Sequence, residues 1–239
     1  MLTATRNALL FVFQVAALVF LTKSFAFATN FIPSESMVPT LEVGDRIVVT
    51  RWPYGYSRHS LLVDPGFAFP GPDGRVAGRL PERGDIVVFT RPRDGETLVK
   101  RVIGLPGDRI ALDGGRLYLN GERVARKDRG TYAYRDANGI VIRVHRYDEV
   151  LPGGRTHAII ERTDSGMADT MAEMTVPEGQ LFVLGDNRDN SLDSRFEETG
   201  LVPVENLQGR ADLVGWSFYT CKAEQGLACA KARFLTMLQ

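Results

Sequence analysis

An apolar stretch near the N-terminus limits what this chain can fold into more than any other feature. Residues 8–21 are apolar apart from Gln14, and after Lys23 the apolar character resumes as far as Ala28. A membrane-spanning helix needs about 20 mostly apolar residues, and residues 8–28 suffice if Lys23 snorkels to the interface. Arg6 precedes the stretch and no acidic residue does. We therefore expect a single-pass anchor in the inner (plasma) membrane, with a cytoplasmic N-terminus and the remaining chain on the extracytoplasmic side.

Two other interpretations of this stretch stay open. Ala26-Phe-Ala28 before Thr29 matches the A-x-A cleavage site of a removable signal peptide. Lys23 counts against cleavage because it interrupts the apolar region just before that site. A buried core helix is the third interpretation. As an anchor, the stretch would place Phe25, Phe27 and Phe31 at the membrane interface.

Composition narrows the class of the remaining chain. With 239 residues and 44% hydrophobic content, the chain can form one full-sized core with a small inserted domain. Lysine plus arginine and aspartate plus glutamate each number 29, and no basic helix or aromatic RNA-binding pattern is visible, so we expect no nucleic-acid partner. The 24 glycines and 12 prolines, set between short alternating runs, favour β structure.

Short apolar runs bounded by turns predict the strands. We expect strands over residues 46–50, 84–89 and 97–103, and a hairpin over residues 117–124 with a type I′ turn at Asn120-Gly121. Residues 52–82, rich in glycine, proline and aromatic residues, predict an extended hairpin or loop.

The two cysteines lie near the C-terminus. Cys221 and Cys229 have the wrong spacing for a zinc site, which takes ligands in close pairs. Outside the cytoplasm a disulfide between them is plausible. Two unpaired thiols are the alternative, and the sequence leaves both open.

A serine segment follows the apolar stretch. Pro33 and Pro39 restrict the backbone on both sides of Ser36. In an extended chain Ser34 and Ser36 point the same way. Ser36 could then attack a carbonyl while the Ser34 hydroxyl and the Ser36 amide bind the developing oxyanion, each donor contributing roughly 10²–10³ in rate. Taken alone, Ser-x-Ser-Met is more typical of a solvated turn; the flanking prolines, the following Gly-Asp turn and the nearby apolar stretch favour the functional interpretation.

A serine nucleophile needs a base, and lysine is the stronger candidate. The three histidines, at positions 59, 145 and 157, lie beside no recognisable motif, so we expect surface or structural roles for them. Lys100 lies in an apolar strand. A free lysine titrates near 10.4, and burial lowers the pKa by up to roughly 3–5 pH units. Strand alternation puts Arg101 on the opposite face.

Three separated runs together identify a family resemblance. They are residues 31–40 around Ser36, Lys100-Arg101 followed by Gly104-Leu-Pro-Gly-Asp108, and the polar run 185–195. In these runs the chain resembles the type I signal peptidases (leader peptidases), which remove signal peptides with a Ser/Lys dyad. The resemblance covers most of the chain, as far as about Phe218.

The resemblance implies a fold and a division of the chain. The fold is mainly β, a coiled antiparallel β-sheet catalytic domain with an inserted β subdomain and one N-terminal transmembrane helix. We expect these parts: residues 1–30, tail and anchor; 31–125, first part of the catalytic core; 126–178, inserted variable subdomain with a hairpin around Asn138-Gly139; 179–218, second part of the core; and 219–239, a tail without a clear pattern.

The resemblance also implies roles for individual residues. Ser36 would be the nucleophile and Lys100 the base, with Ser34 and Ser36 forming the oxyanion hole. Ser191 would hydrogen-bond the neutral lysine, and Gly185 would leave room beside the dyad. The remaining roles are structural pairing of Asp193 with Arg101 and Arg195, and shallow substrate pockets lined by Ile32, Pro33, Met37, Leu41 and Leu98. Many relatives carry tyrosine at the Leu98 position, so this chain departs from the family there.

The expected reaction is cleavage of exported preproteins through an acyl-enzyme, with no metal and no cofactor. The substrate would lie extended along a strand edge, with small residues one and three positions before the cut. Membrane lipid is the second expected partner.

Three other functions are compatible with parts of this pattern. A self-cleaving repressor of the SOS type shares the chemistry but carries a helical DNA-binding domain where this chain has an apolar stretch. A conjugation-type maturation peptidase is closer, although the long insertion argues against it. A membrane-tethered, non-enzymatic β binding domain would leave Lys100 protonated and exposed.

Overall fold

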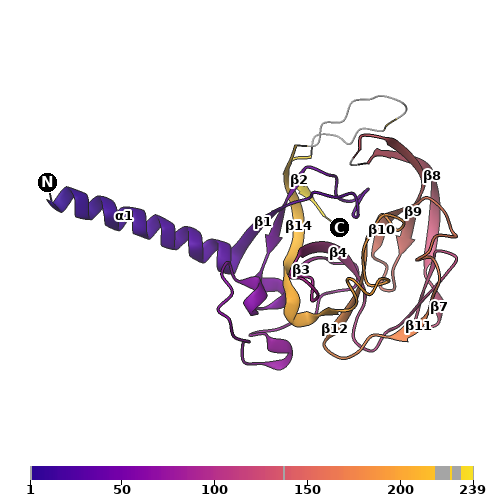
Figure 1. Cartoon of the computed structure of the whole chain (residues 1–239), viewed down its shortest axis with the longest axis horizontal. Coiled ribbons are helices and arrows are strands. Elements are labelled where there is room, and N and C mark those ends of the chain that lie inside the picture. Colours follow the sequence, from indigo (N-terminus) through magenta and orange to yellow (C-terminus); the bar gives the residue numbers. More distant parts are fainter. Residues whose placement is uncertain (1, 137, 219–226, 228–232, 239) are drawn as a thin grey trace.

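The chain forms a long N-terminal helix that projects from a β domain (Figure 1). The computed structural model describes residues 2–136, 138–218, 227 and 233–238. Cys221 and Cys229, with the open question of their disulfide, lie outside these residues. The prediction of a mainly β fold with one N-terminal apolar helix is confirmed.

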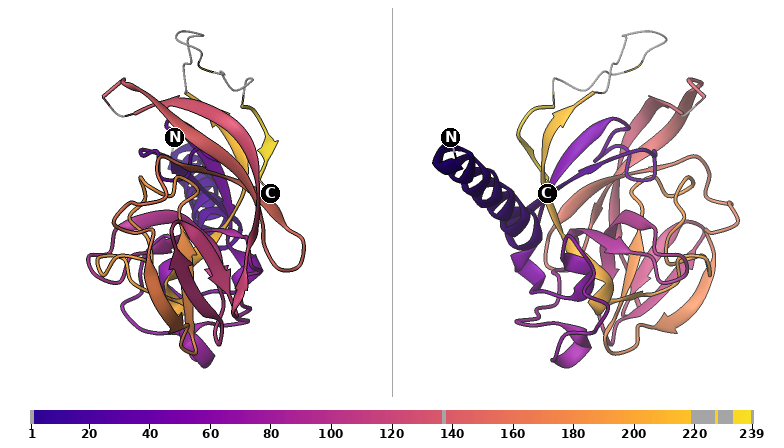
Figure 2. Two further views of the ribbon diagram at one scale, coloured as in Figure 1. Left: turned by 90° about the vertical axis from the view of Figure 1, so that its right-hand side faces the viewer. Right: turned by 60° about the vertical axis from the view of Figure 1, so that its left-hand side comes forward.

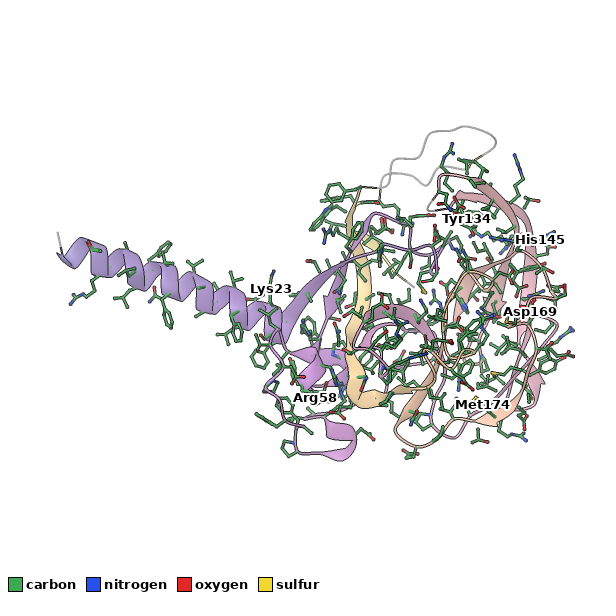
Figure 3. The ribbon with its side chains drawn as sticks, viewed as in Figure 1. Lys23, Arg58, Tyr134, His145, Asp169 and Met174 are labelled. Carbon is green, nitrogen blue, oxygen red and sulfur yellow. The ribbon has the colours of Figure 1, made fainter. Side chains whose placement is uncertain are left out.

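The apolar stretch is helical and runs directly into the first strand. Helix α1 (Leu2–Leu21) continues as a π-helical turn, η1 (Thr22–Ala26), which contains Lys23 near the junction with the domain (Figure 3). The stretch Thr5–Ala26 has a mean hydropathy of 2.0 and is long and apolar enough to cross a membrane. Strand β1 (Phe27–Phe31) follows at once, so the helix ends two residues before the predicted boundary at residue 28.

A large antiparallel sheet contains the core of the domain. Among the described residues, its strands lie in the order β1, β2 (Asp45–Thr50), β14 (Leu207–Ser217), β3 (Ile86–Thr90), β4 (Thr97–Gly104), β12 (Gln180–Leu184) and β13 (Val202–Pro203), and β15 (Thr236–Met237) also pairs with β14. The described part of the tail thus contributes a short strand to this sheet.

Two smaller sheets complete the domain. One consists of β10 (Thr156–Glu161), β9 (Val141–Val150) and β8 (Ala125–Arg135), and the other of β11 (Met171–Thr175), β5 (Arg109–Asp113), β6 (Arg116–Leu119) and β7 (Glu122–Arg123). Strands β8 and β9 form a long curved ribbon (Figure 2). The segment 126–178 therefore contributes to two sheets, and its boundaries stay a prediction.

The turn predicted at Asn120-Gly121 is present and joins two strands of the β5–β7 sheet. Asn120 and Gly121, between β6 and β7, have φ of 56° and 84°. Positive φ at both central residues is the requirement of a type I′ turn, and it explains why asparagine and glycine stand there.

The loop 52–82 is extended, and hydrogen bonds from Arg75 connect it to the backbone around residues 204–207. It contains the short 3-10 turns η2 (Trp52–Tyr54), η3 (Arg58–Ser60) and η4 (Pro72–Gly74), and a bridge between Tyr56 and Val76 gives it the predicted hairpin character. The buried Arg75 guanidinium donates to the carbonyl oxygens of Tyr54 and Gly55 within the loop, and to those of Val204 and Leu207 around a fourth 3-10 turn, η5 (Val204–Asn206). One buried side chain thus joins the backbone of the loop to the backbone around η5.

Alternating side chains of the main sheet enter two separate apolar clusters. The first cluster contains Ile32, Met37, Leu41, Ile47, Val49, Ile86, Val88, Ala211 and Val214. The second contains Tyr54, Val87, Phe89, Val102, Leu181, Val183, Val202, Val204 and Leu207. On β3, Val88 thus packs in the first cluster, whereas Val87 and Phe89 pack in the second. This follows from the period of two along a strand. A third cluster joins Ile110 of β5 to Phe182 of β12, so the β5–β7 sheet is fixed against the main sheet.

Candidate active site

The serine segment leaves the end of β1 and is tied back to the start of β2. The Ile32 amide donates to Asp45 O at 2.9 Å, and the Gly44 amide donates to Ile32 O at 2.9 Å. Beyond this tie, the Glu35 side chain is buried, whereas Ser34 is exposed and Ser36 is half-buried. The Ser34 and Ser36 hydroxyl oxygens lie 3.5 Å apart. The predicted alternation, with both serines on one side, is what the structure has.

Lys100 reaches Ser36 from the middle of β4. Its ammonium nitrogen lies 2.7 Å from Ser36 Oγ and 3.1 Å from Val99 O, and the side chain is only 3% exposed. Burial is the main cause that lowers the pKa of Lys100, to about 8, while the carboxylates of Asp193 and Asp186 act in the opposite direction. A lysine with this pKa is partly neutral near physiological pH, and its neutral amine can accept a proton from the serine.

Arg101 has a partner that the sequence analysis did not name. It donates to both carboxylate oxygens of Asp186, each at 2.8 Å, and to Gly84 O at 2.8 Å. Both side chains of this pair are about 1% exposed. The resemblance predicts a pair between Arg101 and Asp193, whereas in the structure Arg101 forms this bidentate pair with Asp186.

The other half of that prediction agrees with the structure. Arg195 Nε lies 2.8 Å from Asp193 Oδ1, and the Gly185 amide donates to Asp193 Oδ2 at 3.0 Å. Burial by itself raises the pKa of Asp193, but the Arg195 guanidinium and these hydrogen bonds lower it below its ordinary value. The carboxylate therefore stays charged and holds the turn that begins at Gly185.

Ser191 differs from the expectation. Its hydroxyl is buried, and among the residues that the structure describes no donor or acceptor meets it in hydrogen-bonding geometry, so the predicted bond to Lys100 is not formed. Ser191 does contribute to the lowered pKa of Asp193. The second contact of the lysine is the backbone oxygen of Val99.

Gly185 is required because two residues, Ser191 and Ser36, approach its Cα closely. A Cβ atom at this position would clash with Ser191 Oγ and would lie 2.5 Å from both Ser191 Cβ and Ser36 O. These separations are well inside van der Waals contact, and one of the atoms belongs to the serine backbone. The predicted function of Gly185, leaving room beside Ser36 and Lys100, matches this geometry.

A Gly185→Ala variant is expected to be destabilised and to lose most of its turnover. Overpacking of this kind typically lowers the free energy of unfolding by roughly 1–3 kcal/mol, and here the displaced atoms include the Ser36 backbone. Chemical denaturation and preprotein cleavage would be measured on the same samples. Gly139→Ala is the matched control for the steric effect, since a Cβ there meets nothing within 4 Å, although its φ of 79° adds some strain. Equal turnover in Gly185→Ala and wild type would contradict the assigned function of Gly185.

Asn187 is a site residue that the sequence analysis missed. Its amide donates to Ser36 O at 3.1 Å, and its side-chain nitrogen donates to Glu35 O at 3.2 Å. Thr40 was also missed; its hydroxyl donates to Asp186 Oδ2 at 2.5 Å. Both lie within the runs that carry the resemblance, but no local pattern assigns them partners far away in the sequence.

The predicted pocket residues divide between two clusters. Ile32, Met37 and Leu41 are buried together in the first cluster, and Val99 packs against them. Pro33 is exposed. Leu98 packs against the second cluster, with Val87 and Phe89, because it lies on the other face of β4 from Val99. The structure therefore does not bring Leu98 to the other pocket residues.

Each of the three histidines contacts side chains other than Ser36 and Lys100. His157 is buried with Nε2 3.4 Å from Glu149 Oε2, and burial is the main cause that lowers its pKa. His145 stacks on Tyr147, and His59 Nε2 accepts a hydrogen bond from Arg58. Within the described residues, no group of three or more histidine, cysteine or acidic side chains could hold a metal ion.

The family model and the curated relatives that match this chain all bear the name signal peptidase. Residues 5–216 match the family described as signal peptidase, peptidase S26. Signal peptidase I of Rickettsia typhi is 41% identical over 194 residues, which covers 78% of this chain and 70% of the relative. Signal peptidase I of Rickettsia akari is 40% identical over 197 residues with the same coverage. A solved signal peptidase I from Enterococcus faecalis is 28% identical and covers 55% of this chain and 97% of its own, with a TM-score of 0.33.

Proposed function

This chain belongs to the signal peptidase family, peptidase S26, and from that premise we propose that it removes signal peptides with Ser36 as nucleophile and Lys100 as general base. Membership of the family makes it a serine endopeptidase. The observation that carries the assignment is the 2.7 Å separation between the buried Lys100 nitrogen and Ser36 Oγ. Lysine replaces histidine in known variants of the serine–base arrangement.

In the proposed mechanism, neutral Lys100 takes the proton of Ser36 as the serine oxygen attacks the scissile carbonyl. The Ser34 hydroxyl and the Ser36 amide stabilise the oxyanion. The peptide C–N bond then breaks, Lys100 gives the proton to the leaving amine, and the signal peptide remains as an ester on Ser36. A water molecule then gives a proton to Lys100 and attacks the ester carbonyl; the C–O bond to Ser36 breaks, and Lys100 returns the proton to Ser36 Oγ.

Several features support a retained anchor. Strand β1 pairs with β2 along its whole length, from Phe27 opposite Thr50 to Phe31 opposite Arg46. Cleavage after Ala28 would cut this strand, and Ala28 itself packs against the first apolar cluster. We propose that the helix stays attached, with Arg6 on the cytoplasmic side, the β domain on the extracytoplasmic side of the inner membrane and the exposed aromatic rings near the helix end in contact with lipid.

The chemistry of the pocket supports a preference for small residues. Ile32, Met37 and Leu41 flank Ser36 in the sequence and are nearly fully buried in the first apolar cluster, so a substrate side chain that docks beside them would meet a closely packed apolar surface. We propose that they limit the residues one and three positions before the cut. Leu98, on the other face of β4, is left out of this set.

The proposal is tested by cleavage of two preproteins by the purified full-length chain in detergent. One preprotein carries alanine at positions −1 and −3, and the other carries phenylalanine at −1. We expect cleavage of the second to fall by on the order of 10²-fold, because a pocket shaped for a methyl group excludes the larger ring. Product masses identify the cut, and the intact mass of the enzyme shows whether residues 1–28 are retained.

A preprotein with phenylalanine at −2 is the matched control. Side chains alternate along an extended substrate, so the −2 ring points away from the pocket and cleavage should continue. Equal cleavage of the −1 and −2 variants would refute the proposed pocket. No cleavage of any preprotein would refute the proposed function itself.

A further inference from the structure

The three-stranded sheet β8–β10 packs directly on the serine segment. Val38, two residues after Ser36, is 1% exposed and lies in an apolar cluster with Tyr134 of β8, Val144 of β9 and Ile160 of β10. Tyr134 appears on the upper part of this ribbon in Figure 3. A second contact comes from Tyr132, whose hydroxyl donates to Glu42 at 3.0 Å.

Strand β10 forms backbone hydrogen bonds with residues 186–188, the segment that itself hydrogen-bonds to Ser36. The Ile160 amide donates to Asp186 O at 2.9 Å, and the Arg188 amide donates to Ile160 O at 3.0 Å. This is a parallel bridge centred on Asn187. Asn187 in turn donates its amide to Ser36 O at 3.1 Å. A continuous line of backbone hydrogen bonds therefore runs from β10 through Asn187 to the serine.

A buried ion pair between Arg188, the residue after Asn187, and Glu149 of β9 restrains this chain of hydrogen bonds. Arg188 Nη1 and Nη2 donate to the two carboxylate oxygens of Glu149, in β9, at 3.1 and 2.5 Å. Both side chains are 2% exposed, and His157 Nε2 lies 3.4 Å from the same carboxylate. A bidentate pair in such a site permits little change of geometry. The Arg188 carbonyl oxygen accepts from Arg195 Nη2 at 2.5 Å, which joins the pair to the Asp193 turn.

We propose that Glu149 is a positioning residue for the reaction, and that the β8–β10 sheet serves to hold Ser36 at the correct distance from Lys100. Through Arg188 and Asn187, Glu149 fixes the carbonyl of the serine without touching substrate. Displacements of about 1 Å at a reacting group lower rates by up to roughly 10²-fold. Loss of the pair therefore slows the chemical step more than it weakens substrate binding. This inference rests on the proposed function of Ser36 and Lys100.

The test is steady-state cleavage by full-length wild type and by the double variant Glu149→Met/Arg188→Met. Replacing both partners of a buried ion pair with apolar side chains often leaves stability unchanged or raises it, so the fold should persist. We expect kcat to fall at least 10-fold, KM to stay within twofold of wild type and the melting midpoint not to decrease. A purely structural function of the pair would leave kcat of the folded variant unchanged, and that result overturns the proposal.

Two further variants make the outcome unambiguous. Asp148→Asn is the matched control, because the neighbouring Asp148 pairs with Arg129 near the surface, and its kcat should equal that of wild type. If the double variant does not fold, Glu149→Asp replaces it: the charge remains, but the shorter side chain retracts the carboxylate. We expect a severalfold lower kcat with unchanged KM for Glu149→Asp, and wild-type kcat would overturn the proposal. Cleavage by wild type and Asp148→Asn confirms that the proposed function itself is intact.

Discussion

A Lys100→Met variant is expected to lose preprotein cleavage completely and to keep its fold. Methionine fills the buried space of the lysine but cannot accept the proton of Ser36. In the wild type, kcat/KM should rise with pH through about 8, because the fraction of neutral Lys100 rises there. Cleavage would be measured from pH 6 to pH 10 for both proteins. Residual turnover with the same pH dependence in the variant would mean that another group is the base.

The same variant is expected to be more stable than wild type at neutral pH. The pKa of Lys100 falls from 10.5 to about 8 on folding, so between these values the unfolded chain binds more protons than the folded chain. The free energy of unfolding therefore rises with pH across this window. Below pH 8 the burial of the charged form opposes folding by on the order of 3 kcal/mol, and methionine removes this opposition.

Urea denaturation at pH 7 and at pH 10.5 checks this difference, which should be largest at pH 7 and shrink as the pH rises. Lys127→Met is the matched control, because Lys127 is exposed on β8. It should change neither cleavage nor the pH dependence of stability. A Lys100→Met variant that is less stable than wild type at pH 7 would contradict the conclusion that burial of the charged lysine opposes folding.

A Ser36→Ala variant is expected to lose the acyl-enzyme and all turnover, with little change in stability. Ser36 is only half-buried, and its hydroxyl contacts Lys100 and Ser34 rather than a backbone acceptor. Cleavage of a preprotein with alanine at −1 and −3 would be measured alongside the intact mass of the enzyme during turnover. The mass of the acyl-enzyme should be absent from the variant.

Ser34→Ala provides the contrast for this result. It keeps the nucleophile and removes one oxyanion donor, so turnover should fall by roughly 10²–10³-fold rather than vanish. If Ser36→Ala retained more turnover than Ser34→Ala, Ser34 rather than Ser36 would be the nucleophile. If both retained wild-type turnover, the nucleophile would lie elsewhere.

Much of the site could be predicted because its features are local. The alternation of Ser34 and Ser36 depends only on an extended backbone, and the apolar strand around Lys100 is itself the cause of burial. The type I′ turn at Asn120-Gly121 depends on the two residues that form it. In each case neighbours in the sequence provide the determining interaction.

Other features depend on contacts between distant segments. Arg101 pairs with Asp186, 85 positions away, whereas the family resemblance predicts Asp193, which lies in the same polar run 185–195 as Asp186. Both carboxylates satisfy the rule that a buried charge needs a partner, and only the register of β4 against β12 decides between them. Leu98 likewise lies on the face of β4 that the sheet turns away from Met37.

The sequence by itself thus determined the apolar N-terminal helix, the β class, and the presence of a serine and a desolvated lysine, because hydrophobic pattern, backbone alternation and burial in an apolar strand are properties of neighbouring residues. Only the tertiary structure decided the 2.7 Å approach of Lys100 to Ser36, the partner of Arg101, the separation of the Ser191 hydroxyl from Lys100 and the support of Ser36 by β10. These depend on how strands remote in sequence pair and pack, and the energies that select one pairing are sums over many contacts that no short motif contains.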